Sequence, residues 1–244
     1  MSLRVRSIQK LIAINEDLFF YPRLKKFYAK HLTSSSPITV LDVGSNRGQS
    51  IDFFISIDPS ARIIGFEPNP DLFNSLVKRF ASNKNITVFP YGVSDIEGTR
   101  TLQQNIMNET STFEDLNYDS KYLKRKARIL GVSPKDIIVQ SYETEVISLR
   151  SFLELHPMTN IDVLKIDVEG HELNCLRGLF DVPHKSYPIR FIQLESHQDD
   201  MYVNDDPHEE INTLLLANGF ELCERIRHGF GKFFELIYRN TQSA

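Results

Sequence analysis

Apolar and amphipathic stretches alternate along most of the chain. Apolar runs at 38–43, 61–66 and 86–91 are separated by stretches at 49–57 and 71–80 in which apolar residues recur at helical spacing. Continuous apolar runs of this length are typical of strands that are buried on both faces. The alternation predicts an α/β fold, doubly wound around a mostly parallel sheet with helices on both faces.

The second half of the chain continues this pattern and ends in a hairpin. The pattern predicts two further strands, at 161–167 and 189–195. It also predicts three helices, which end near residues 156, 180 and 218. The last two apolar runs, 220–227 and 232–239, are joined by only four residues. Because so short a connection forces two strands to run antiparallel, the final strand is expected to oppose the others.

Two regions lie outside this alternation. Residues 1–36 predict an N-terminal helical appendage, interrupted at Tyr21-Pro22, that covers one edge of a main domain at 37–244,. It could also serve as a contact between subunits of a homo-oligomer, through residues 1–32, or as a wall of the substrate site. Residues 104–136 form an insertion with a polar loop and a basic helix, and we expect a substrate wall or lid there,.

Composition and charge narrow the class of protein. The 244 residues carry a net charge of −4, with 41% hydrophobic and 25% charged residues, as in ordinary globular proteins,. This balance predicts no nucleic-acid partner. We expect no membrane insertion because no apolar run is long enough and no signal peptide is recognisable,. Two cysteines form no disulfide framework, so a cytoplasmic location is expected,.

The first strand leads into a glycine-bracketed turn, Gly44-Ser45-Asn46-Arg47-Gly48. Glycines allow the backbone to approach a ligand closely, and the following helix presents unpaired N–H groups at its start. Carboxylates stand beside this turn and at two other strand ends: Asp42, Glu67 and Asp167. Because parallel strands end at the same edge of a sheet, these side chains are expected to meet.

The sequence of this turn favours a ligand without phosphate groups. Its G-x-x-x-G spacing is not that of a dinucleotide fold, and no Walker lysine is present,. Asp42 would repel a diphosphate but suits a cation, such as the sulfonium of S-adenosylmethionine. Glu67 follows the turn by about 20 residues, the separation at which a carboxylate reaches ribose hydroxyls,. Asp95, after the third strand, is placed to accept a hydrogen bond from an adenine amino group.

Four stretches of the sequence resemble the FkbM-type methyltransferases: 40–48, 65–70, 92–95 and 164–172. The resemblance implies a Rossmann-like class I methyltransferase fold, with seven strands and an antiparallel last strand. It also implies O-methylation of a hydroxyl on a saccharide or small metabolite. The donor contacts that it implies lie around the methionine end (Asp42, Gly44, Ser45, Asn46 and Gly48), the ribose (Glu67, with Pro68 and Asn69 beside it) and the adenine (Ser94 and Asp95).

A hydroxyl acceptor gains from a base that removes its proton. Asp167 is the first choice, as a residue of the active edge, and Glu169 and His171 follow within one turn. Glu195 and His197, at the end of the fifth strand, are the other base candidates. A divalent metal that activates the acceptor is a less favoured alternative.

Two other functions remain open. An NAD-type Rossmann oxidoreductase would use the same architecture, although the turn lacks the glycine pattern of such enzymes. A catalytically silent scaffold would keep the donor site without transferring a methyl group.

Overall fold

Seven strands form one central sheet. The computed structural model describes residues 3–32, 36–107, 111–180, 187–197, 200–203, 208–228 and 233–242. Across the sheet the strands lie in the order β3 (Ile86–Phe89), β2 (Arg62–Phe66), β1 (Thr39–Val43), β7 (Ile161–Ile166), β8 (Ile189–His197), β10 (Phe233–Asn240) and β9 (Phe220–Arg227). Neighbours are parallel except that β10 runs antiparallel to both β8 and β9. The predicted doubly wound sheet with an antiparallel last strand is confirmed.

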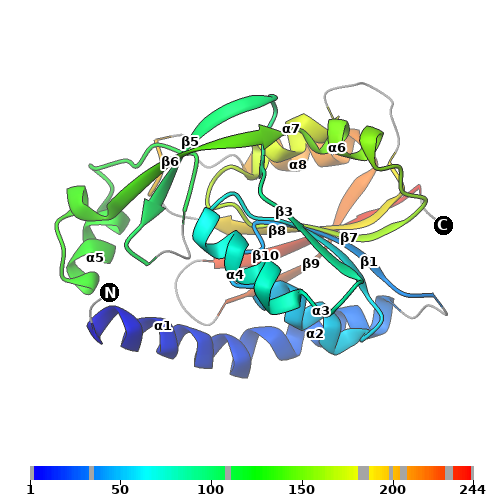
Figure 1. Ribbon diagram of the computed structural model, residues 1–244, viewed down its shortest axis with the longest axis horizontal. Helices are drawn as coiled ribbons and strands as arrows, with labels where there is room; N and C mark the ends of the chain where they lie inside the picture. The colour runs from blue at the N-terminus through cyan, green and yellow to red at the C-terminus, as the bar shows by residue number, and fades with distance from the viewer. Residues whose placement is uncertain are drawn as a thin grey trace.

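Side chains alternate between two apolar layers on the central strands. One layer contains Val40, Val163, Phe191 and Ile237, and the helices on that side are α2 (Tyr21–His31), α3 (Gln49–Ile57) and α4 (Pro70–Phe80). The other contains Leu41, Leu164, Ile192 and Leu236, beneath α6 (Leu149–Leu155), α7 (Glu172–Phe180) and α8 (His208–Ala217). The two groups of helices lie on opposite sides of the sheet (Figure 1). Because successive strand residues point to opposite faces, apolar runs serve both layers.

The N-terminal segment is one continuous helical stretch. It consists of α1 (Leu3–Asn15), a π-helical turn η1 (Glu16–Phe20) and α2. Tyr21-Pro22 does not interrupt it, because Pro22 falls in the first turn of α2, where a missing N–H is tolerated,. Leu24, Phe27 and Tyr28 are buried in the core, and the Tyr28 hydroxyl donates to Gln193 Oε1 at 2.6 Å. α2 therefore covers a face of the sheet, whereas the sequence indicated an edge.

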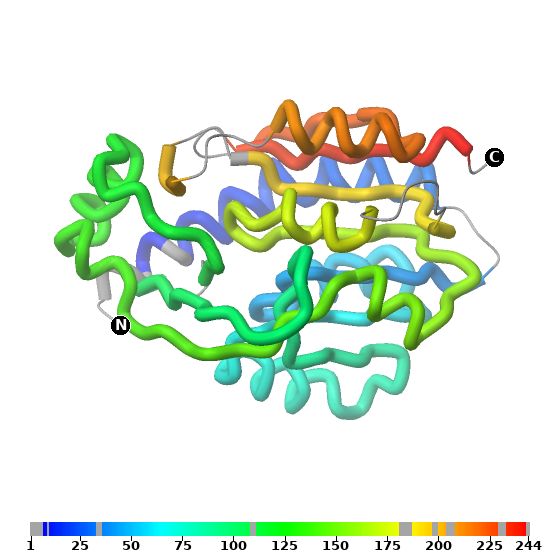
Figure 2. Tube along the Cα trace, turned by 90° about the horizontal axis from the view of Figure 1, so that it is seen from above, coloured from blue at the N-terminus to red at the C-terminus, as the bar shows by residue number. Residues whose placement is uncertain are grey.

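A second sheet stands beside the first. Its strands are β4 (Gly92–Val93), β6 (Ile138–Ile147) and β5 (Gly98–Asn105), and the long strands β5 and β6 pair antiparallel. Between them lie α5 (Lys121–Leu130) and a 3₁₀ turn η2 (Pro134–Asp136). This unit occupies one end of the molecule, seen in green in Figure 2. The basic helix predicted in the insertion is confirmed as α5, but the pairing of β5 with β6 was not predicted.

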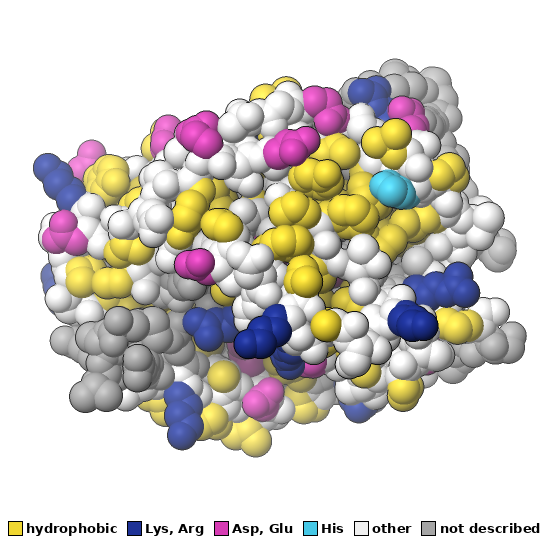
Figure 3. Space-filling model, viewed as in Figure 1, with side chains coloured by type: hydrophobic (Ala, Val, Ile, Leu, Met, Phe, Trp, Pro, Cys, Tyr) yellow, Lys and Arg dark blue, Asp and Glu magenta, His cyan; other side chains and the backbone are white. Residues whose placement is uncertain are grey.

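On the face shown in Figure 3, lysine and arginine side chains are interspersed with acidic, apolar and uncharged ones. Within the described ranges, no helix has the length and apolar character needed to cross a membrane.

The packing of α2 leads to a stability prediction. Leu24→Ala should lower the free energy of unfolding by about 2–5 kcal/mol, because Leu24 is only 2% exposed and its removal leaves a cavity,. Leu18→Ala, in the same helical stretch but 63% exposed, is the control and should change it by less than about 0.5 kcal/mol,. Urea denaturation of both variants measures the difference. Equal losses would contradict the assignment of α2 to the core.

Candidate active site

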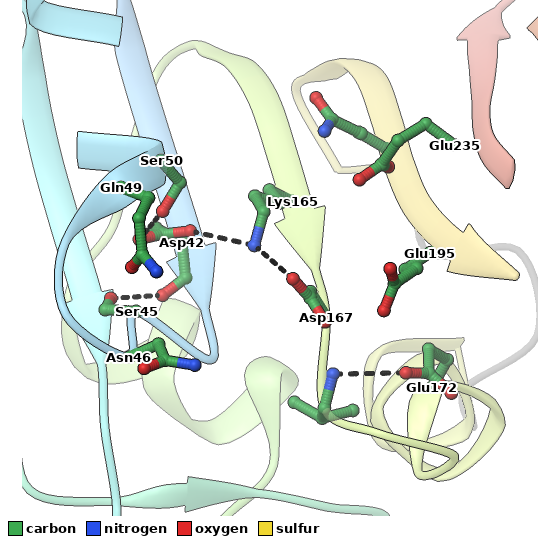
Figure 4. Close-up of polar contacts among 12 residues, drawn as sticks. Asp42, Ser45, Asn46, Gln49, Ser50, Lys165, Asp167, Glu172, Glu195 and Glu235 are labelled. Atoms are coloured by element: carbon green, nitrogen blue, oxygen red, sulfur yellow. Dashed lines mark hydrogen bonds and ion pairs between the residues drawn. The ribbon is translucent and has the colours of Figure 1, made fainter. Parts of the chain in front are cut away.

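A row of polar side chains crosses four strands at one end of the sheet. Asp42 on β1 is in register with Lys165 on β7, which is in register with Gln193 on β8. Two residues further along β8, Glu195 faces Glu235 on β10. Figure 4 shows Asp42, Lys165, Glu195 and Glu235 of this row. Because laterally aligned residues point to the same face, the row lies on the face that carries the apolar layer beneath α2 and extends this layer into a polar zone,.

The Lys165 ammonium lies at the centre of this row. Its Nζ is 3.1 Å from Asp167 Oδ2 and 3.6 Å from Asp42 Oδ1 (Figure 4). Burial disfavours the charged amine, but the carboxylates of Asp167, Asp42 and Glu235 outweigh it and raise the pKa of Lys165 well above its ordinary value,. Asp42 is fully buried and also accepts a hydrogen bond from Ser50 Oγ at 2.6 Å. The lysine therefore stays charged and holds the two aspartates in place.

Glu67 is fixed by backbone N–H groups from two turns. The Asn46 N–H donates to Oε2 at 2.7 Å, and the Asn69 N–H donates to Oε1 at 2.9 Å. The first contact depends on the turn after β1, where Asn46 adopts a positive φ of 52°. Glu67 is 5% exposed, and this burial raises the pKa of its carboxyl to about 7, against the N–H groups that favour the ionised form,.

Gly44 allows the ends of β1 and β7 to approach each other. Its φ is +81°, and a Cβ at this position would lie 1.9 Å from the backbone oxygen of Asp167. Only glycine satisfies both conditions without displacing the backbone. Gly44 therefore brings the turn after β1 next to Asp167.

A cavity of about 340 Å³ opens above these strand ends, a size typical of small-molecule sites. Of the residues with a predicted donor or catalytic role, its wall contains Gly44, Ser45, Asn46, Glu67, Pro68, Asp167, Glu169 and Glu195. The N-terminal helical stretch contributes Glu16, Phe20 and Tyr21 to another side. From the insertion, Phe113 and Lys126 also line it. Segments far apart in the sequence thus enclose one cavity, whose wall combines these polar side chains with apolar ones.

Sequence comparison identifies the family of this chain. The Methyltransferase FkbM domain profile matches residues 42–222. The chain belongs to the FkbM methyltransferase family. The resemblance inferred from the four motifs is confirmed.

Two curated relatives match parts of the chain. AMB antimetabolite synthetase AmbE of Pseudomonas aeruginosa is 26% identical over 207 residues, which are 76% of this chain and 10% of that protein. Hexuronic acid methyltransferase AglP of Haloferax volcanii is 30% identical over 158 residues, which are 64% of this chain and 54% of that protein. The chain thus matches about a tenth of the first relative and about half of the second.

Solved structures confirm the fold. The METTL16 methyltransferase domain aligns with a TM-score of 0.52 and 11% identity, over 91% of this chain and 67% of that one. At this identity the likeness concerns architecture alone. Together with the strand order, it confirms the predicted class I methyltransferase fold.

Several predicted site residues of this FkbM domain lie outside the cavity wall. Asp42 is buried behind it, Gly48 packs against Phe80, and Asn69 caps α4 through its side chain. Asp95 is one-third exposed and pairs with Arg100 at 3.3 Å. The donor roles of these residues remain predictions.

His171 lies in a buried polar network away from the cavity wall. Its Nδ1 is 2.6 Å from Glu114 Oε1, and its Nε2 is 3.0 Å from Ser94 Oγ. Asn174 Nδ2 also lies 3.0 Å from Nδ1. The ring is fully buried. Through its contacts with Glu114 and Ser94 it joins the insertion to the residue that follows β4. The geometry gives His171 a bridging position, while its catalytic role stays a prediction.

Glu169 and Glu195 do lie at the cavity. Glu169 adopts a positive φ of 55°, its carbonyl accepts from Thr112 Oγ1 at 2.7 Å, and the Tyr202 hydroxyl donates to its carboxylate at 3.2 Å. Glu195 Oε1 lies 3.9 Å from His228 Nε2. The side chain of His197 falls outside the described residues. The structure thus places two further carboxylates with Asp167.

Outside the predicted lid, four charged residues of the cavity wall had no predicted role: Glu16, Lys165, His228 and Glu235. Lys165 and Glu235 each have apolar neighbours on both sides within a strand, which is the sequence signal that could have identified them,. Glu16 and His228 gave no such signal, because they lie at a helix junction and a strand end. Among the described residues, no group of three His, Cys, Asp or Glu side chains is arranged to hold a metal ion.

The close approach at Gly44 can be tested by substitution. Gly44→Ala should lower the free energy of unfolding by at least about 3 kcal/mol, because backbone strain and a clash with Asp167 add together,. Gly98→Ala is the control, since Gly98 also has a positive φ but a Cβ there meets nothing within 4 Å. It should cost only the strain of its backbone conformation, about 1–3 kcal/mol, and less than Gly44→Ala. Similar losses in chemical denaturation would argue against the clash.

The carboxyl of Glu67 should make stability depend on pH. Its pKa rises from 4.5 to about 7 on folding, so its contribution is complete below pH 4.5 and is lost as the pH rises through 7,. The wild type should therefore lose up to about 3 kcal/mol over this range relative to Glu67→Gln, which cannot titrate. Urea denaturation at pH 5 and pH 8 measures this. Parallel changes in both proteins would show that burial does not perturb Glu67.

Proposed function

We propose that this FkbM protein is an S-adenosylmethionine-dependent methyltransferase that methylates a hydroxyl of a saccharide or small metabolite. The observation that carries the proposal is the buried Glu67 carboxylate, held between the Asn46 and Asn69 N–H groups at the cavity wall. A carboxylate oxygen has more than one acceptor site, so Glu67 retains capacity for ribose hydroxyls. The name of the relative AglP, a hexuronic acid methyltransferase, supports a saccharide as the acceptor.

The charges around the cavity fit this donor. Its sulfonium and ammonium groups would face Asp167 and the other carboxylates of the wall, which balance positive charge in a site of low dielectric,. A dinucleotide would bring two phosphates to the same wall. The residues therefore suit S-adenosylmethionine better than NAD, the cofactor of the rival oxidoreductase function.

Asp167 is the favoured proton acceptor. The donor supplies a methyl group that its sulfonium charge has already activated, and the acceptor hydroxyl loses its proton as its oxygen takes the methyl group. Asp167 lines the cavity, and Lys165 Nζ fixes its carboxylate through a 3.1 Å hydrogen bond. A carboxylate held in one position can orient the hydroxyl and accept its proton. Glu169 and Glu195 are the alternatives at the same wall.

The donor site is tested by calorimetric titration with S-adenosylhomocysteine, in parallel with NAD. We expect the wild type to bind S-adenosylhomocysteine, and Glu67→Ala to weaken binding about 10- to 100-fold through loss of charge-assisted hydrogen bonds. Glu221→Ala, which removes an exposed carboxylate on β9, is the control and should bind as the wild type does. Binding of NAD without S-adenosylhomocysteine would contradict the proposal. Donor binding without methyl transfer to any hydroxyl compound would instead favour the silent scaffold.

A further inference from the structure

The cavity has a second group of ionisable side chains, at the end formed by β8, β10 and the N-terminal helical stretch. His228 Nδ1 is 3.8 Å from Glu16 Oε1, and His228 Nε2 is 3.7 Å from Glu235 Oε1 and 3.9 Å from Glu195 Oε1. The imidazole also stacks on Phe20, with ring centroids 4.1 Å apart. The N-terminal helical stretch, β8, β10 and the end of β9 therefore bring one histidine and three carboxylates together, and we call this group the Glu235 cluster.

Two buried atoms of the Glu235 cluster lack hydrogen bonds. Glu235 is 3% exposed, and its Oε2 has no hydrogen-bond partner among the described residues. The same holds for His228 Nε2, whose side chain is 10% exposed. Buried polar atoms are normally satisfied, and leaving a carboxylate oxygen without a donor is costly. Both residues line the cavity, so a bound molecule can supply the missing partners.

Histidine does not neutralise this end of the cavity. Burial alone would lower the pKa of His228, but Glu16, Glu235 and Glu195 raise it to about 10, so the imidazole is charged at neutral pH. One positive charge then faces three carboxylates. Lys165, the nearest other cation in the row, is already shared between Asp167 and Asp42.

Over the whole wall, acidic residues also outnumber basic ones. Its acidic residues are Glu16, Glu67, Asp167, Glu169, Glu195 and Glu235, and its basic residues are Lys126, Lys165 and His228. S-adenosylmethionine carries one net positive charge and would leave the wall negative. A second cation is therefore favoured at the remaining end, and an anion is opposed.

Building on the proposed methyltransferase function, we propose that the Glu235 cluster binds an acceptor that carries a protonated amino group near its hydroxyl. The ammonium donates to the free oxygen of Glu235 and to its neighbour Glu195, while His228 offers a donor to an acceptor oxygen. Glu16 adds charge from the N-terminal helical stretch. The substrate class is thus an amino sugar or a similar amino alcohol, and the excess of negative charge opposes a carboxylate group of an acceptor at this end of the cavity,.

The test uses three sugars that differ in charge: glucosamine, glucose and glucuronate. Each is titrated into protein saturated with S-adenosylhomocysteine, and binding is followed by ligand-detected NMR. We expect glucosamine to bind at least about tenfold more tightly than glucuronate, with glucose between them. Glucosamine that fails to bind, or glucuronate that binds equally well, would overturn the inference.

Charge-neutral variants identify the residues responsible. Glu235→Gln should weaken glucosamine binding about tenfold or more and change glucose binding much less. Glu195→Gln, at a less buried position, makes the same comparison if Glu235→Gln folds poorly. Glu221→Gln on β9 is the matched control and should bind all three sugars as the wild type does. Unchanged discrimination in both cluster variants would overturn the inference.

The same titrations separate the two proposals. Protein that does not bind S-adenosylhomocysteine would overturn the proposed methyltransferase function, and the acceptor inference with it. Protein that binds S-adenosylhomocysteine but does not prefer glucosamine would overturn the acceptor inference alone.

Discussion

The buried ammonium of Lys165 is the interaction on which the rest of the site depends. It stands between Asp42 and Asp167, and Glu235 also contributes to its charge stabilisation. Without a cation there, the buried carboxylates of Asp42 and Glu235 and the partly exposed one of Asp167 would have no compensating charge, which is strongly unfavourable for the buried pair,. The lysine therefore allows the sheet to present carboxylates at its ligand-binding edge while the strands below remain apolar.

The cavity lies along the ends of the strands from β2 to β10, and its two ends differ chemically. Near β2, Glu67 is held by backbone N–H groups, and burial makes its charged form costly. Near β10, the carboxylates surround a charged histidine and keep their negative excess. Backbone hydrogen bonds thus hold the carboxylate at one end of the cavity. At the other end, the charge of the His228 imidazole holds a group of carboxylates.

Two segments outside the regular alternation complete the enclosure. The N-terminal helical stretch seals the apolar layer through Leu24 and Tyr28 and presents Glu16 and Phe20 to the cavity. On the opposite side, the unit around β5 and β6 contributes Phe113 and Lys126. The His171 network fixes this unit to the main domain through Glu114. The shape of the cavity therefore depends on contacts that are distant in the sequence.

The sequence by itself determined the fold class, the order of the main strands and helices, and the edge at which Glu67 and Asp167 lie. Those features are local: apolar runs define buried strands, and glycines with strand-end acids mark the ligand edge. Only the tertiary structure decided that α2 covers a face of the sheet and that β5 pairs with β6. It placed His171 outside the cavity wall, where this residue links Glu114 of the insertion to Ser94. It also decided that Glu16, His228 and Glu235 meet, because their proximity arises from the packing of a helix against two strands and has no trace in local spacing.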